Sequence, residues 1–179
     1  DRVCTDYQKW SLTPARPGRV SVNLSLRQLK QRDFIGRVQA IYAQHGVPPD
    51  ALELEITETT LMEDPKRTLH LLHELHRLGL RLAIDDFGTG YSSLSALQQF
   101  PISTLKIDQS FVQNATTDHD QATIVALIIE MGHSLKLEVV AEGVESEDQL
   151  RFLRALNCDY AQGLLFGRAM AADDFRDLV

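Results

Sequence analysis

The most constraining feature of this sequence is a regular alternation of short, β-branched runs with longer helical stretches. Six runs have strand character, and they are Arg19–Ser25, Ala51–Thr57, Leu80–Asp86, Thr104–Asp108, Leu137–Glu142 and, more weakly, Tyr160–Leu165. Five stretches between them have helical periodicity, and they are Leu26–Gln44, Pro65–Leu78, Ser92–Phe100, Asp120–Leu135 and Ser146–Leu156. No hairpin-forming dipeptide joins two strand runs, so consecutive strands are expected to run parallel, with helices crossing between them. The alternation predicts an α/β fold of about six βα units.

Local signals support these boundaries. Asp64-Pro65 is typical of a helix start, and Ser146 with Gln149 forms a capping-box pattern. Gly46 and Gly79 stand where two helices are expected to end. No Gly-rich linker interrupts the series, which predicts one domain over residues 1–179. A doubly wound sheet and a (β/α)8 barrel both fit at this point, although six units leave a barrel two units short of the roughly 250 residues that are typical.

Composition narrows the classes of partner. The formal charge is −7, and an acidic chain is a poor binder of DNA, RNA or anionic membranes. The only two cysteines, Cys4 and Cys158, lie far apart and offer neither a zinc framework nor a disulfide scaffold. This usage favours a reducing, cytoplasmic location. No apolar run approaches the roughly 20 residues of a membrane helix, so no membrane segment is expected.

Polar side chains cluster where the predicted strands end. Five runs finish with them, and the residues are Asn23, Glu55, Glu58, Asp85, Asp86, Lys106, Asp108, Glu142 and Glu145. Each one alone is most simply explained as a solvated loop entry, but five successive strands with the same ending favour a shared site. In a parallel barrel such ends converge, and gathered carboxylates repel one another unless cations lie among them. An all-oxygen ligand set selects Mg²⁺ or Mn²⁺ over zinc.

Two further features bear on chemistry. Lys106, inside an apolar run, is a candidate fixed positive charge near a phosphate or an attacking water, with an exposed edge lysine as the alternative. Gly88-Thr89-Gly90 is a candidate phosphate cradle, but its spacing is neither that of a P-loop nor that of a dinucleotide-binding fold.

These residues lie in motifs that follow one another in a familiar order. The motifs are Asn23-Leu24-Ser25, Glu55-Ile56-Thr57-Glu58, the DDFGTGYSSL segment from Asp85 to Leu94, Lys106-Ile107-Asp108 with Ser110-Phe111, Glu142-Gly143-Val144-Glu145, and Gln162-Gly163 with Phe166. Together they resemble the EAL domain, a bacterial family of phosphodiesterases that act on cyclic di-GMP.

The resemblance implies a TIM-type barrel that carries two divalent ions, Mg²⁺ or Mn²⁺, and hydrolyses cyclic di-GMP to linear pGpG by in-line attack. Carried over by position, the implied metal ligands are Asn23, Glu55 and Asp85 for the first ion and Asp85, Asp86 and Glu142 for the second. The implied catalytic residues are Lys106, Glu142 and Asp86, with Lys106 positioning or polarising the attacking water. Other implied roles are loop anchoring by Glu145, over residues 87–94, and substrate binding by Gln162 and Asp108.

The chain also departs from the family pattern. No Glu-Ala-Leu tripeptide precedes Asn23, so we expect a missing ligand of the first ion and missing initial strands. Ala169 and Leu164 replace a usual proline and a common aromatic residue, changes expected to be mild. A non-catalytic cyclic di-GMP receptor or scaffold, and a different Mg²⁺-dependent barrel enzyme, are the alternatives. The resemblance further implies a homodimer and a parent chain with diguanylate cyclase, PAS or receiver domains.

Overall fold

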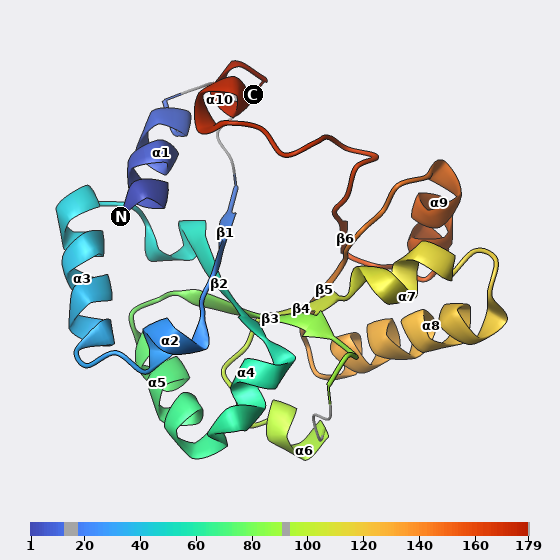
Figure 1. Cartoon of the computed structure of the whole chain (residues 1–179), viewed down its shortest axis with the longest axis horizontal. Coiled ribbons are helices and arrows are strands. Elements are labelled where there is room, and N and C mark those ends of the chain that lie inside the picture. Colours follow the sequence, from blue (N-terminus) through green and yellow to red (C-terminus); the bar gives the residue numbers. More distant parts are fainter. Residues whose placement is uncertain (13–17, 91–93, 179) are drawn as a thin grey trace.

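The computed structural model describes residues 1–12, 18–90 and 94–178 and contains one six-stranded parallel sheet (Figure 1). Its strands are β1 (Val20–Asn23), β2 (Leu52–Thr57), β3 (Arg81–Phe87), β4 (Thr104–Ile107), β5 (Glu138–Ala141) and β6 (Tyr160–Ala161). Each strand pairs with the next in sequence, in the order β1 to β6. A doubly wound sheet reverses its order at a switch point. The sequential order therefore selects the barrel alternative.

Helices alternate with the strands. They are α1 (Arg2–Trp10), α2 (Leu26–Leu29), α3 (Phe34–His45), α4 (Glu58–Glu63), α5 (Pro65–Arg77), α6 (Leu94–Leu97), α7 (Gln109–Asn114), α8 (His119–Ser134), α9 (Glu147–Ala155) and α10 (Ala172–Leu178), with a short 3-10 turn at Pro49–Ala51. Among them, α3, α5 and α8 lie on the outer side of the curved sheet (Figure 1). At the N-terminal ends, the Asp64 side chain caps α5 and the Ser146–Gln149 capping box starts α9, as predicted.

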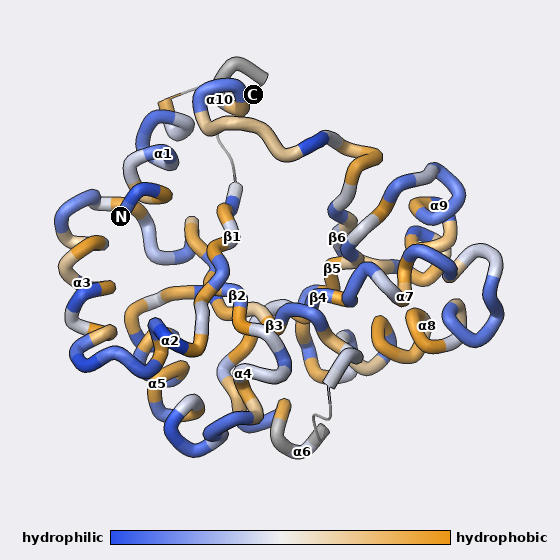
Figure 2. Tube along the Cα trace, viewed as in Figure 1, coloured by the Kyte–Doolittle hydropathy of each residue, from blue (hydrophilic) through white to orange (hydrophobic). Residues whose placement is uncertain are grey.

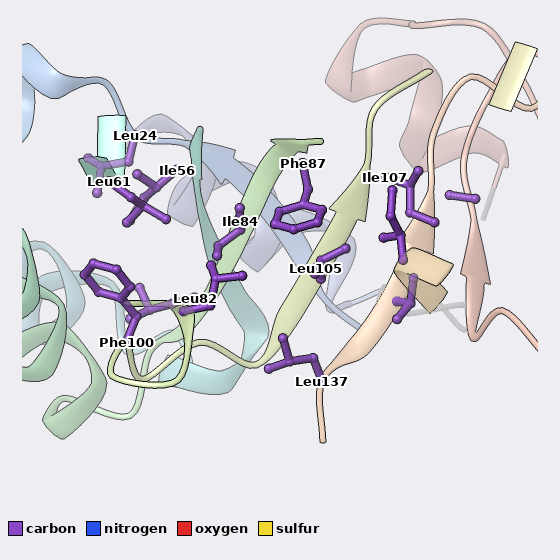
Figure 3. Close-up of a cluster of buried hydrophobic side chains, with 14 of the residues drawn as sticks. Leu24, Ile56, Leu61, Leu82, Ile84, Phe87, Phe100, Leu105, Ile107 and Leu137 are labelled. Atoms are coloured by element: carbon purple, nitrogen blue, oxygen red, sulfur yellow. The ribbon is translucent and has the colours of Figure 1, made fainter. Parts of the chain in front are cut away.

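The main core lies between the sheet and these helices. Ile56, Ile84 and Leu105 come from three neighbouring strands and are almost fully buried, together with Leu61 of α4 and Phe100 (Figure 3). The helices mix hydrophobic and hydrophilic residues along their length (Figure 2), as expected for helices with one face on a sheet. Because side chains alternate along a strand, the apolar outer face leaves the opposite face of β2, β3 and β4 for polar residues.

Three predicted boundaries are wrong. The expected helix Leu26–Gln44 is two helices, because α2 ends after one turn and Asp33 adopts a left-handed conformation with φ of 59° before α3. The strand expected over Tyr160–Leu165 stops at Ala161. The helix expected over Ser92–Phe100 ends at Leu97, and Ser92 and Ser93 lie outside the described residues.

The first and last helices, α1 and α10, contact each other. The indole N–H of Trp10 in α1 donates to the carbonyl oxygen of Ala172 in α10 at 2.9 Å, and the ring meets Phe175 edge-on with centroids 5.1 Å apart. This contact brings α10 beside α1 across the open side of the arc (Figure 1). None of the helices in the described part of the chain is long and apolar enough to cross a membrane.

Candidate active site at the carboxyl ends of the strands

The centre of the candidate site is the ammonium group of Lys106. Its Nζ lies 2.7 Å from Oε1 of Glu55, 3.2 Å from Oδ1 of Asp85 and 2.6 Å from Oε1 of Glu142. These residues come from β2, from β3 and from the residue that follows β5, while Lys106 itself is on β4. The fold therefore gathers side chains separated by 87 positions in sequence around one point.

The side chain of Lys106 reaches across a strand to Glu55. Glu55 of β2 and Thr104 of β4 are both register partners of Ala83, which stands between them on β3. Lys106 lies two residues after Thr104 on β4, and its side chain crosses β3 to reach Glu55.

A local irregularity brings two consecutive aspartates to the same side. In a regular strand Asp85 and Asp86 point to opposite faces. Here the β3–β4 register shifts between Ile84 and Phe87, and Asp86 has a positive φ of 54°. Each of three residues consequently offers one carboxylate oxygen to a common group, and these oxygens lie within 4.8 Å of one another. The residues are Asp85, Asp86 and Glu142. These three carboxylates are close enough to share a cation.

The carboxyl-end cluster, which comprises Glu55, Asp85, Asp86, Lys106 and Glu142, is short of positive charge. Burial raises the pKa of Asp86, and the neighbouring Asp85 raises it further. Burial also raises the pKa of Glu142, against the opposing effect of its bond with Lys106. Burial alone would lower the pKa of Lys106, but its hydrogen bonds with Glu142 and Glu55 raise it, so the lysine is protonated at neutral pH. One cation faces four carboxyl groups, the pattern expected of a site that takes up further cations.

The other predicted site residues surround this cluster. Asn23 is exposed at the end of β1 and is the register partner of Glu55. The side chain of Asp108 caps α7 by accepting a hydrogen bond from the backbone of Ser110 at 2.9 Å. Gln162 and Glu145 line a depression of about 500 Å³ that also includes Glu142. The cluster therefore opens beside a space of ligand size.

A family model for the EAL domain matches residues 1–169. The chain belongs to the EAL domain family. The solved structure of the MucR phosphodiesterase in complex with c-di-GMP aligns to it with a TM-score of 0.92 and 40% identity, over 97% of this chain and 70% of that one. This likeness confirms the predicted TIM-type architecture, of which the six βα units described here form part.

Two curated relatives come from Pseudomonas aeruginosa. MucR, a bifunctional diguanylate cyclase/cyclic di-GMP phosphodiesterase, is 40% identical over 173 residues, which cover 97% of this chain and 25% of MucR. The cyclic di-GMP phosphodiesterase NbdA is 41% identical over 169 residues, which cover 94% of this chain and 22% of NbdA. This EAL domain thus spans a quarter or less of the length of these two relatives.

In the described part of the loop that follows β3 in this EAL domain, Glu58 bonds the backbone, while the anchoring role of Glu145 stays a prediction. The Oε2 atom of Glu58, a buried side chain at the start of α4, accepts hydrogen bonds from the backbone N–H of Gly88 at 3.0 Å and of Gly90 at 3.1 Å. Glu145 is exposed and lines the same depression as Glu142. Glu58 and Glu145 each end a four-residue motif that begins with a glutamate, so the sequence pattern alone does not distinguish them. Glu58 reaches the loop because α4 packs against β3. Tyr91, Ser92 and Ser93 of this loop lie outside the described residues.

Sequence reasoning also missed a second polar layer on the same face of the EAL domain. We call it the amino-end network, and it comprises Arg19, Glu53, Arg81, Thr104 and Glu138. Glu53 accepts from Arg19 at 2.9 Å and from the Thr104 hydroxyl at 2.6 Å, and its carboxylate lies 3.5 Å from Arg81. Glu138 accepts from Arg19 at 2.9 Å and from Arg81 at 2.6 Å. Alternating charged residues within β2 and β3 were the available signal.

Proposed function

We propose that this EAL domain hydrolyses cyclic di-GMP. The observation that carries the proposal is the carboxyl-end cluster: one lysine among four carboxyl groups, at the strand ends, beside a depression of about 500 Å³. An anionic dinucleotide approaches such a cluster only when cations compensate the carboxylates. The relatives MucR and NbdA, named as cyclic di-GMP phosphodiesterases, support this substrate.

The residues present fit divalent metal ions. The donor set consists of carboxylate and amide oxygens, without a cysteine or histidine in the cluster, and this is the set that Mg²⁺ and Mn²⁺ prefer. We assign Asn23, Glu55 and Asp85 to one ion and Asp85, Asp86 and Glu142 to a second. When bound, two such ions stabilise the negative charge that develops on the attacking and leaving oxygens of a phosphodiester.

Lys106 supplies the fixed positive charge of the proposed mechanism. Its bonds to Glu55 and Glu142 hold the ammonium group over the centre of the site, and its raised pKa keeps it charged during turnover. A charged, buried ammonium group at this place favours the anionic transition state by electrostatic attraction. Glu142 and Asp86, whose pKa values are raised, complete the proposed catalytic set.

Gln162 and Asp108 are proposed to orient the substrate. Gln162 is exposed on the wall of the depression that contains Glu142, where its amide offers both a donor and an acceptor to a nucleotide. Asp108 lies two residues after Lys106 and caps α7, which fixes its carboxylate near the cluster. We propose that cleavage of one phosphodiester gives linear pGpG. We also propose that the domain works in the cytoplasm as a homodimer. In its parent chain we expect it to be linked to a signalling domain of the diguanylate cyclase, PAS or receiver type.

A hydrolysis assay tests the proposal. The full-length natural protein is incubated with cyclic di-GMP and Mg²⁺ or Mn²⁺, with an EDTA control and Lys106→Met as the inactive comparison. We expect a product one water heavier than the substrate, formed only with metal and only by the wild type. Binding of cyclic di-GMP without any hydrolysis under either metal would contradict the proposal and favour a receptor.

A further inference from the structure

Gln149 is a buried side chain with every hydrogen-bonding atom in use. It stands in the first turn of α9 and is 7% exposed. Its Oε1 accepts hydrogen bonds from the backbone N–H of Glu145 at 2.8 Å and of Ser146 at 3.0 Å. Its Nε2 donates to the carbonyl oxygens of Gln113 at 3.2 Å and Val112 at 3.5 Å. One amide group therefore joins two separate segments of the barrel wall.

Those two segments both lead to the candidate site. The β5–α9 loop, residues 142–146, begins with Glu142, whose carboxylate contacts Lys106 at 2.6 Å. Helix α7 begins at Gln109, three residues after Lys106, and Gln149 donates to carbonyl groups near its C-terminal end. Gln149 thus ties the segment that carries Glu142 to the helix that follows Lys106.

Close contacts enclose this loop on two sides, and its Val144 N–H also donates to the carbonyl oxygen of Gln162 at 3.0 Å. A Cβ added at Gly143, which has φ of +70°, would lie 2.5 Å from Cβ of Gln109, so the loop runs directly against the start of α7. On the other side, a Cβ at Gly163 would lie 2.2 Å from the carbonyl oxygen of Val144. The loop is pressed between α7 and the turn after β6, and Gln162 and Gln109 line the same depression as Glu142.

The chain contains a matched case that separates capping from bridging. Gln28 occupies the same position of a capping box in α2, with its Oε1 accepting from the backbone of Ser25 at 2.9 Å. The capping box of Gln28 follows β1, which ends at Asn23. The capping box of Gln149 follows β5, which ends just before Glu142. Gln28 is exposed, however, and among the described residues its amide nitrogen donates no hydrogen bond to a second element.

We infer that Gln149 is a positioning residue of the candidate active site: by bridging α7 and the β5–α9 loop, it sets the place of Glu142 and of the depression beside it. This inference rests on the proposed function for its catalytic consequence. Residues that orient a site residue from behind typically contribute about 10- to 100-fold in activity or metal affinity.

The test compares three variants of the full-length protein, Gln149→Met, Gln149→Glu and Gln28→Met. Methionine keeps the unbranched shape and removes all four hydrogen bonds. Glutamate still accepts from the Glu145 and Ser146 N–H groups, but its carboxylate repels the carbonyl oxygens of Val112 and Gln113. We expect kcat/KM for cyclic di-GMP to fall about tenfold or more in both Gln149 variants and less than about twofold in Gln28→Met, at saturating Mg²⁺ and well below the melting temperatures.

Hydrogen exchange provides the readout that does not depend on turnover. In Gln149→Met we expect faster exchange in peptides that cover residues 142–149 and unchanged exchange in β5, whereas Gln28→Met leaves residues 142–149 protected. Unchanged exchange in Gln149→Met, or an equal loss of activity in Gln28→Met, would overturn the inference. Wild-type protein without hydrolysis would refute the proposed function, whereas wild-type hydrolysis that Gln149→Met leaves intact would refute only the role of Gln149.

Discussion

The two polar layers on the inner face of the sheet use similar residues to opposite effect. The amino-end network pairs two arginines with two glutamates and is balanced in charge. The carboxyl-end cluster opposes one lysine to four carboxyl groups and is not. Both layers are built on the same strands, because residues two or four positions apart share a face. The balanced charges of the amino-end network fit a layer that stabilises the fold. The excess negative charge of the carboxyl-end cluster fits a layer that can bind cations.

Burial and bonding in the two layers follow the same division. Burial alone would lower the pKa of Arg19, but its bonds to Glu138 and Glu53 raise it. The Arg19 guanidinium is therefore charged, and the two carboxylates compensate its charge without any ligand. In the carboxyl-end cluster the pKa values of Asp86 and Glu142 are raised, which marks carboxyl groups that are poorly compensated in the metal-free protein. A protein tolerates such a site only when the rest of the fold provides stability.

The largest expected effect comes from removing one charge in the carboxyl-end cluster. Asp85→Asn should lower cyclic di-GMP hydrolysis by about 1000-fold, the upper end of the loss for removing one transition-state contact. The free energy of unfolding in EDTA should stay equal or rise, because one of several repelling carboxylates becomes neutral. Hydrolysis assays and urea unfolding measure the two quantities.

Glu55→Gln is the companion variant and should behave in the same way. Turnover at the wild-type rate in either variant would refute the metal-ligand assignment. A loss of stability in EDTA without a loss of turnover would mean that the carboxyl-end cluster is structural, as the amino-end network is.

A change in the amino-end network should produce the reverse result. Glu53 accepts from Arg19 and Thr104 and faces Arg81, and its side chain is only 5% exposed. Glu53→Gln should lower the free energy of unfolding by about 3 kcal/mol, because breaking a buried ion pair leaves buried charge uncompensated. Hydrolysis by the molecules that remain folded should be retained, which a urea titration and an assay at low temperature together establish.

Glu138→Gln is the matched control within the amino-end network. Its side chain bonds to the same two arginines but is 34% exposed, so the expected loss is at most about 1 kcal/mol. If Glu138→Gln costs as much as Glu53→Gln, burial is not what gives this layer its strength.

The last prediction sharpens the comparison, since it concerns a buried carboxylate near the site that accepts two backbone hydrogen bonds. Glu58→Ala should free the N–H groups of Gly88 and Gly90 and cost about 1–3 kcal/mol, the usual penalty for leaving buried polar groups unpaired. Hydrogen exchange of a peptide over residues 86–90 measures the release. Glu145→Ala should leave that peptide protected, and the opposite ranking of the two variants would support the anchoring role predicted for Glu145.

The sequence by itself determined the order of the elements and the chemistry of the site. The alternation of apolar runs and helical stretches predicted parallel βα units, because the hydrophobic period of each segment is a local property. The endings of those runs, from Asn23 to Glu142, predicted an oxygen-rich site at the strand ends. The capping patterns at Asp64 and Ser146 predicted helix starts correctly, since a cap involves only neighbouring residues.

Only the tertiary structure decided which residues act on which. The choice of a sequential strand order over a doubly wound one depends on pairing between distant segments. The same holds for the hydrogen bonds by which Gln149 joins two segments, and for those by which Glu58 holds Gly88 and Gly90. These assignments depend on distances between residues tens of positions apart, and such distances are set by packing, which a pattern of residue types along one chain does not contain.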